Sequence, residues 1–220
     1  MRCVHASFRI DCCCFRQARA STELLSIQWS DEIASLARSR KHMEQVWISL
    51  GSNVGDRLGH LRRAIAALDP LGKLTAVSDA YETEPVGPVE QPWFLNAVAG
   101  LQVKNEQSPE RLLEALLALE RAMGRERGAQ SAPKGPRTID LDIVLYGSRV
   151  VASPGLTIPH PEMHRRRFVL EPLTQVAPEA VHPLLNRSAR ELLRELTEER
   201  PEVSSQAVRR YAALSLPEVR

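Results

Sequence analysis

The chain has 220 residues, of which 43% are hydrophobic and 25% are charged, the balance of an ordinary globular protein. Its formal charge of +2 is too small to indicate binding to nucleic acid or to an anionic membrane surface. No apolar run approaches the roughly 18 residues that a membrane span needs, so we expect a cytoplasmic protein without nucleic-acid or membrane partners.

The first 42 residues show no sustained hydrophobic period of either type. All four cysteines lie here, at Cys3, Cys12, Cys13 and Cys14, and no second Cys/His cluster at zinc-like spacing completes a metal site. We therefore expect residues 1–42 to be an unstructured leader. Our hypothesis is that Met43 is the initiator, or at least that the fold starts there.

A strand and an amphipathic helix open the folded part. Residues 46–50 read as a strand, and Asp56 is placed to cap the helix that follows. Four apolar residues fall on one face of this helix, namely Leu58, Leu61, Ile65 and Leu68. The next strands are predicted at residues 74–81 and 94–103, with a loop over residues 83–92 because that stretch is rich in proline.

A second helix begins with Ser108 as N-cap and Pro109 at its first position, and we expect it to end at Gly124. Residues 138–146 form the next predicted strand. The order strand–helix–strand–strand–helix–strand predicts an α+β fold, a ferredoxin-like sandwich with an antiparallel sheet and helices packed on one face.

The remaining chain is predicted to hold shorter elements. They are a proline-rich stretch, a short helix-like segment near residues 162–168 and a helix at residues 189–196, and after Glu199 we expect a weakly structured tail. We place one catalytic domain at residues 43–186 and a C-terminal helix and tail at residues 187–220.

The sharpest motif is the run GPRTIDLDI at residues 135–143. Because neighbours two apart in a strand point the same way, Asp140 and Asp142 share one face while Ile139, Leu141 and Ile143 take the other. Two bare carboxylates repel each other, and Mg²⁺ typically uses one or two carboxylates together with substrate phosphates. The alternative is a pair of solvated acids on an open sheet face.

Basic residues surround this motif in the sequence. Arg125 and Arg127 follow the helix end, Arg137 precedes the acids, and His160 and residues 165–167 (Arg-Arg-Arg) come later. Arginines bind phosphate oxygens in bidentate fashion, so the set indicates phosphoryl-type transfer. Taken singly, each arginine could be a surface charge and His160 a turn residue. Neither G-x-x-x-x-G-K-[ST] nor G-x-G-x-x-G occurs, which excludes P-loop proteins and typical protein kinases.

From about Val46 to about Pro183 the chain resembles the 6-hydroxymethyl-7,8-dihydropterin pyrophosphokinase family of folate biosynthesis. The matching motifs, in order, are LGSN (50–53), TEPVGP (83–88), QPWFLNA (91–97), GRER (124–127), GPRTIDLDI (135–143), IPH (158–160) and RRF (166–168). The resemblance implies that the hydroxymethyl oxygen of the pterin attacks the β-phosphorus of ATP and that AMP leaves.

The resemblance also implies roles for individual residues. Asp140 and Asp142 would hold two Mg²⁺ ions that bridge the triphosphate of ATP. The phosphate contacts would come from Arg125, Arg137, His160 and Arg166, with Arg127 as a mobile helper. The pterin would lie between Phe94 and Phe168, with Asn96 and the Thr83 backbone reading its hydrogen-bonding edge and Val86 among the substrate-binding residues. Glu120 and Thr157 would lie near the nucleotide.

Some positions depart from the family pattern. Lys134 replaces a tryptophan found in many members, residues 128–133 form a slightly longer segment in what the family uses as a lid, and Pro161 stands where a tyrosine is often found. Two other functions stay open, another Mg²⁺-dependent phosphotransferase and a non-catalytic nucleotide- or pterin-binding protein. The sequence names no general base, and we expect a monomer.

Overall fold

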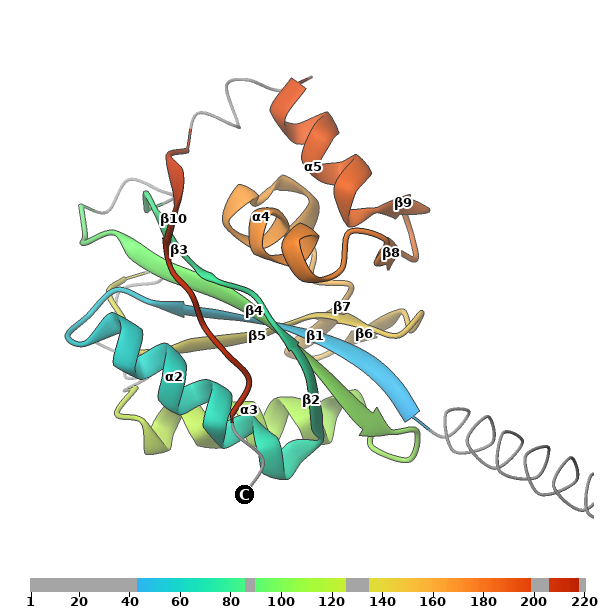
Figure 1. Cartoon of the computed structure of the whole chain (residues 1–220). Helices are drawn as coiled ribbons and strands as arrows, with labels where there is room; N and C mark the ends of the chain where they lie inside the picture. Colours follow the sequence, from blue (N-terminus) through green and yellow to red (C-terminus); the bar gives the residue numbers. More distant parts are fainter. Residues whose placement is uncertain (1–42, 86–89, 126–134, 199–205, 218–220) are drawn as a thin grey trace, which may run out of the picture. The chain divides into compact units, whose positions relative to one another are not determined.

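The computed structural model describes residues 43–85, 90–125, 135–198 and 206–217. In these residues a six-stranded sheet runs in the order β10-β3-β4-β1-β5, and β2 also pairs with β4 (Figure 1). The strands of this sheet are β1 (Met43–Ser52), β2 (Lys73–Val77), β3 (Ala80–Thr83), β4 (Phe94–Lys104), β5 (Asp140–Tyr146) and β10 (Val208–Ala212). All of their pairings are antiparallel, as predicted for a ferredoxin-like sandwich.

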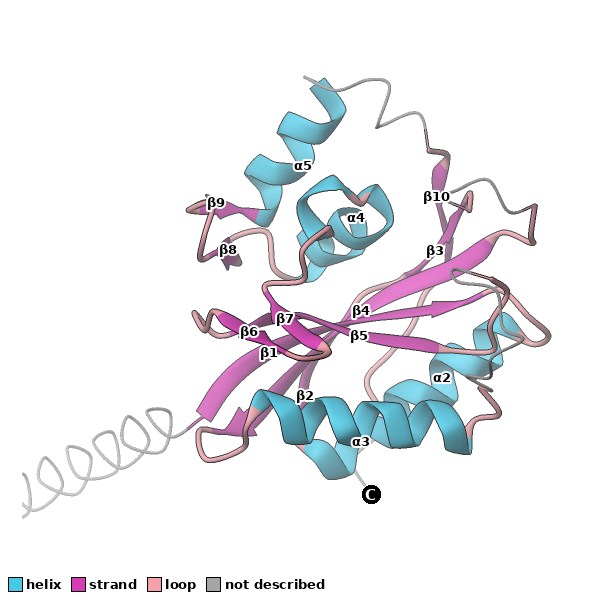
Figure 2. Ribbon diagram, turned by 180° about the vertical axis from the view of Figure 1, so that it is seen from behind, coloured by secondary structure: helices cyan, strands magenta, loops and turns pink. Residues whose placement is uncertain are grey.

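Two helices cover one face of this sheet, α2 (Arg57–Leu68) and α3 (Pro109–Ala122) (Figure 2). Both predicted caps are confirmed, because Asp56 accepts a hydrogen bond from the Gly59 backbone and Ser108 accepts one from Arg111. Their apolar sides and the strand residues facing them form one core cluster, which includes Ile48, Leu50, Leu61, Ile65, Leu112, Leu116 and Leu141. Each fully buried leucine or isoleucine contributes about 1.5–3 kcal/mol.

The opposite face is covered by α4 (Arg167–Val176) and α5 (Ala189–Glu198), so the expectation of helices on one face holds for α2 and α3 alone (Figure 1). A second cluster fills the space beneath α4 and α5, with Val98, Val144, Leu170, Leu173 and Leu192 among its members. The predicted helix at residues 189–196 is confirmed as α5. The segment near residues 162–168 is instead a 3₁₀ turn, Met163–Arg165, leading into the longer α4. The sequence did not predict the full length of α4, because Pro172 lies inside it and proline usually ends a helix.

The single strand predicted at residues 74–81 is two strands, β2 and β3. The break comes at Ser78, whose hydroxyl accepts a hydrogen bond from the Val98 backbone at 2.9 Å, while its own backbone N–H donates to the Val98 carbonyl at 2.9 Å. Both pieces pair with β4, but at different stretches of it. A side-chain hydroxyl thus replaces a backbone group of the ladder, which a hydrophobic pattern cannot reveal.

The expectation of a weakly structured tail after Glu199 is wrong for its described part, because β10 pairs with β3. The other small elements of the described residues are a 3₁₀ turn, Asp69–Leu71, and two hairpins. One hairpin is formed by β6 (Val151–Ser153) with β7 (Leu156–Ile158) and the other by β8 (Val181–His182) with β9 (Arg187–Ser188). No helix among the described residues is both long and apolar enough to cross a membrane.

Candidate active site

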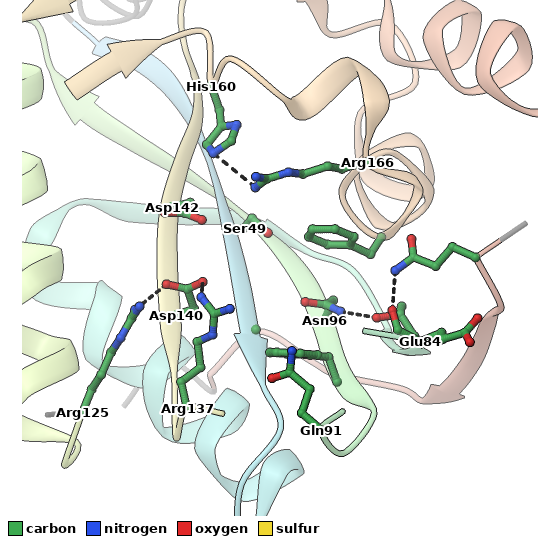
Figure 3. A pocket seen from close by; sticks show the side chains of 15 residues that line it. Ser49, Glu84, Gln91, Asn96, Arg125, Arg137, Asp140, Asp142, His160 and Arg166 are labelled. Carbon is green, nitrogen blue, oxygen red and sulfur yellow. Dashed lines mark hydrogen bonds and ion pairs between the residues drawn. The ribbon is translucent and has the colours of Figure 1, made fainter. Parts of the chain in front are cut away.

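A pocket of about 310 Å³ opens on the face of the sheet that carries the two acids (Figure 3). Strand register explains its position, because Gly51 of β1 lies opposite both Asn96 of β4 and Asp140 of β5. These three positions therefore form a row across neighbouring strands. A Cβ atom on Gly51 would lie only 2.8 Å from Asn96 Oδ1, so the missing side chain makes room for the Asn96 amide.

The two acids differ sharply in their partners. Asp140 accepts hydrogen bonds from Arg125 Nη1 and, at 2.5 Å, from Arg137 Nη1. Asp142 lines the pocket on the same side of β5, yet none of the described residues donates a hydrogen bond to its carboxylate. Burial, and after it the negative charge of Asp140, raises the pKa of Asp142 to about 6. The alternation predicted for this strand is confirmed by buried Leu141 and Ile143 on its other side.

Arg125 is aimed at Asp140 by the end of α3. Gly124 adopts a left-handed backbone with φ of 85°, which a residue with a side chain rarely adopts, and the chain then turns toward β5. Glu120, with 1% of its surface exposed, also accepts hydrogen bonds from Arg125 and, at 2.8 Å, from the Leu141 backbone. Glu120 does not line the pocket, so its place is behind Arg125 as a support.

His160 and Arg166 form another basic corner of the pocket (Figure 3). The Glu162 backbone N–H donates to His160 Nδ1 at 3.1 Å, and Arg166 Nη1 lies 3.3 Å from His160 Nε2. Burial, and then the positive charge of Arg166, lowers the pKa of His160 to about 4. The ring is therefore neutral at pH 7. A neutral imidazole has one acceptor nitrogen, so which of these two contacts it accepts depends on its tautomer.

The other end of the pocket is aromatic and amide-lined. Phe94 and Phe168 both line it, and the guanidinium groups of Arg137 and Arg166 lie 5.3 Å and 5.7 Å from their respective ring centroids. The side chain of Asn96, which is 4% exposed, donates to Thr83 Oγ1 at 2.7 Å. This end suits a flat polar heterocycle, while the acids and arginines occupy the rest of the pocket.

The structure brings most of the expected site residues together. Those that line the pocket are Thr83, Phe94, Asn96, Arg125, Arg137, Asp140, Asp142, His160, Arg166 and Phe168. Thr157, in contrast, lies on β7 with its side chain exposed and is not among the lining residues. Val86, Arg127 and Lys134, with the rest of the expected lid segment at residues 128–133, lie outside the described residues.

Five further lining residues were not predicted as site residues: Ser49, Gly51, Glu84, Gln91 and Gln206. Gly51, Glu84 and Gln91 lie inside motifs that carried the family resemblance, so these motifs could have indicated them as site residues. Ser49 and Gln206 lie outside those motifs. Gln91 is held by the 2%-exposed Asn53, whose Nδ2 donates to Gln91 Oε1 at 3.0 Å and whose Oδ1 accepts from the Arg137 backbone at 2.7 Å. Gln206 comes from the supposed tail and had no signal at all.

No group of three or more His, Cys, Asp or Glu side chains in the described residues is arranged to hold a metal ion. The acid pair is nevertheless suited to Mg²⁺, which is commonly bound by one or two carboxylates while substrate phosphates and water complete its shell. Asp142 supplies the structural argument, because its partly buried carboxylate lies near Asp140 and receives no hydrogen bond from any residue that the structure describes. A cation there would remove the repulsion between the two acids.

Comparison with known proteins shows the family of the chain. Residues 47–178 match the model of the 7,8-dihydro-6-hydroxymethylpterin-pyrophosphokinase (HPPK) family. The 2-amino-4-hydroxy-6-hydroxymethyldihydropteridine pyrophosphokinase of Haemophilus influenzae is 40% identical over 143 residues, which are 64% of this chain and 86% of that protein. The enzyme of the same name from Bacillus subtilis is 42% identical over 132 residues, covering 59% and 76% of the two chains.

Longer proteins are also similar. The Folic acid synthesis protein fol1 of Schizosaccharomyces pombe is 39% identical over 169 residues, which are 76% of this chain but 21% of that protein, so the chain spans about a fifth of this relative. The crystal structure of Plasmodium falciparum HPPK-DHPS wild type with pteroate shares the fold, with a TM-score of 0.55 and 16% identity over 74% of this chain and 45% of that one. With the match over residues 47–178, this chain belongs to the 7,8-dihydro-6-hydroxymethylpterin-pyrophosphokinase family.

Proposed function

We propose that this protein transfers a diphosphate group from ATP to the hydroxymethyl oxygen of 6-hydroxymethyl-7,8-dihydropterin and releases AMP. Diphosphate transfer from ATP to hydroxymethylpterin is the reaction of the family to which the chain belongs. The observation that carries the proposal is one pocket with two chemically distinct ends. Phe94, Phe168 and Asn96 line one end, and Asp140, Asp142 and the arginines line the other.

At the aromatic end, the pterin would lie against the rings of Phe94 and Phe168. Ring-on-ring contact orients a flat heterocycle without specifying it, so specificity would come from hydrogen bonds at its edge. Asn96 is suited to this role because the hydrogen bond to Thr83 holds its amide in one orientation. The hydroxymethyl group would then point toward the acids and arginines.

At the charged end, the triphosphate would be held by arginine side chains and by His160. In the tautomer with the proton on Nε2, His160 and the neighbouring Arg166 Nη1 would both donate to one phosphate oxygen. Arg125 and Arg137 would leave Asp140 and bind the phosphate chain. As the hydroxymethyl oxygen attacks the β-phosphorus and the bond to the α-phosphate oxygen breaks, these cations stabilise the charge that moves onto AMP.

Asp140 and Asp142 would hold Mg²⁺, and we propose two ions. When bound, Mg²⁺ neutralises the triphosphate and makes the β-phosphorus more electrophilic. Strand β5 would present both carboxylates on one face. No described residue donates a hydrogen bond to the Asp142 carboxylate, so no such bond would compete with Mg²⁺ there. We further propose that the protein is located in the cytoplasm and acts as a monomer. Light scattering on the purified protein would test the oligomeric state.

The test is analysis of nucleotide products after mixing the protein with ATP, Mg²⁺ and 6-hydroxymethyl-7,8-dihydropterin. We expect AMP, and only when the pterin is present. Asp140→Ala and Asp142→Ala should each abolish turnover, whereas Glu179→Ala, which removes an acid with a 75% exposed side chain, should not. Release of ADP would indicate an ordinary kinase reaction, and tight binding of ATP without product would indicate a non-catalytic binding protein.

A further inference from the structure

Gln206, two residues before the C-terminal strand β10, supplies part of the pocket wall although it lies outside the residues that match the family model. The family match ends at residue 178, whereas Gln206 lines the pocket. From there the chain continues into β10, which runs antiparallel to β3 at the edge of the sheet (Figure 1). The pocket is therefore completed by a segment that the family comparison does not cover.

Gln206 is held in place through both its side chain and its backbone. Its Nε2 donates to the Glu84 carbonyl at 2.5 Å, and its own carbonyl accepts from Arg167 Nη1 at 3.4 Å. The adjacent Ala207 carbonyl accepts from the Glu84 backbone N–H at 3.0 Å. These contacts fix the Gln206 amide beside the end of β3, where Thr83 and Glu84 also line the pocket.

Two ion pairs anchor the strand behind Gln206. Arg209 Nε donates to Glu82 at 2.8 Å, and Arg210 Nε lies 2.6 Å from Asp79. The carboxylate side chains are only 9% and 7% exposed, so each needs a partner to offset the loss of hydration. Glu82 has a second partner in Arg57 at 2.9 Å. The strand is thus tied to buried charges of β3 and of the turn before it.

We propose that Gln206 is a further substrate-binding residue, whose Oε1 atom accepts a hydrogen bond from a ring N–H group of the pterin. The proposal rests on the proposed function. Among the described residues Oε1 has no hydrogen-bond partner, while Nε2 is already committed to Glu84. Gln206 lines the same pocket as Asn96, and the two amides contact the neighbouring residues Glu84 and Thr83, where a flat heterocycle with N–H groups on its edge would lie.

This geometry makes Gln206 a specificity-determining residue. An acceptor oxygen fixed on the wall favours a ligand that presents an N–H group there, and it penalises an analogue that presents nothing or presents another acceptor. Glu84 and β10 have a positioning role instead, because they hold Gln206 in place and the proposal requires no contact between them and the ligand.

The test is calorimetric titration of 6-hydroxymethylpterin into the full-length protein with Mg²⁺ and a non-hydrolysable ATP analogue. Three variants are compared with wild type: Gln206→Ala, Gln206→Met and Arg210→Ala. Gln206→Met keeps the length and bulk of the side chain but removes the acceptor together with the Nε2 donor to Glu84. Arg210→Ala alters β10, the strand that follows Gln206, at a residue that does not line the pocket, and Asp79 keeps a hydrogen bond from Gln175 at 2.6 Å.

We expect both Gln206 variants to raise the pterin Kd about fivefold, as for the loss of one neutral hydrogen bond. Titration of the ATP analogue alone should be unchanged, and Arg210→Ala should bind pterin like wild type. Wild-type affinity in Gln206→Met would mean that only packing matters, and an equal loss in Arg210→Ala would mean that the strand as a whole matters. Either result overturns the proposal.

Failure of the inference is distinguishable from failure of the proposed function. If wild type releases AMP in the presence of pterin while both Gln206 variants keep its pterin affinity, Gln206 has no binding role and the enzyme assignment stands. If wild type neither binds pterin nor releases AMP, the proposed function is wrong and the role of Gln206 is wrong with it.

Discussion

Replacing Asp142 with asparagine should stabilise the protein in the absence of Mg²⁺ while abolishing its activity. Burial of this carboxylate, and after it the negative charge of Asp140, raises its pKa from 3.8 to about 6. That rise corresponds to about 3 kcal/mol of free energy at neutral pH. Asparagine still buries a polar amide, so we expect a net gain of about 2 kcal/mol.

The pH dependence follows from the direction of the pKa change. Above pH 6 the folded protein must hold Asp142 ionised at a cost, whereas below pH 4 the group is protonated in both the folded and the unfolded chain. The advantage of Asp142→Asn should therefore be full at pH 7 and should fade as the pH falls from 6 to 4. In this window the wild type gains stability relative to the variant.

The assay is thermal or urea denaturation in EDTA at pH 7 and pH 4.5, with Asp140→Asn as the matched control. For a chain of this size, about 2 kcal/mol corresponds to a Tm increase of about 4–8 °C. Asp140→Asn should shift the Tm in the opposite direction, because it removes the anion shared by Arg125 and Arg137. The reasoning is refuted if both variants move the Tm in the same direction, or if the gain for Asp142→Asn persists undiminished at pH 4.5.

Three further predictions follow from individual contacts. Gly51→Ala should weaken pterin binding about tenfold with little change in Tm, because its Cβ would displace the Asn96 amide; an unchanged pterin Kd by titration would contradict this. The His160→Gln variant should lose less stability than wild type between pH 7 and pH 4.5, as measured by urea denaturation. The reason is that folded His160 stays neutral with a pKa of about 4, whereas the unfolded chain takes up a proton near pH 6.5. Equal losses of stability in the variant and the wild type would refute this prediction. Arg125→Ala should lower kcat about 100-fold and also lower the Tm, since it removes the ion pair between Arg125 and buried Glu120. A change confined to KM would contradict the catalytic part.

Several features of the protein were predictable from the sequence because local geometry determines them. The helix caps at Asp56 and Ser108 depend on residues three positions away. The shared face of Asp140 and Asp142 depends only on the two-residue repeat of a strand. The order of the elements then limited the fold to a ferredoxin-like sandwich, and the motifs indicated most of the side chains that line the pocket.

Other features depend on partners far away in the chain. The break of the predicted strand at Ser78 requires Val98 of a neighbouring strand, and α4 forms despite Pro172 because the opposite face of the sheet needs a cover. The difference between the two acids was also invisible in the sequence, because it lies in which of them the arginines reach.

The C-terminal strand shows most clearly what only tertiary structure decided. Residues 208–212 carry exposed arginines and no strong hydrophobic alternation, so by themselves they predict no strand. They form β10 because the free edge of β3 offers backbone hydrogen-bond partners, and because buried Glu82 and Asp79 require cations. That pairing brings Gln206 to the pocket wall, more than 120 residues along the chain from the Glu84 carbonyl it contacts. Only folding brings these groups together, since the energy of each contact depends on the partner that the rest of the chain has already placed.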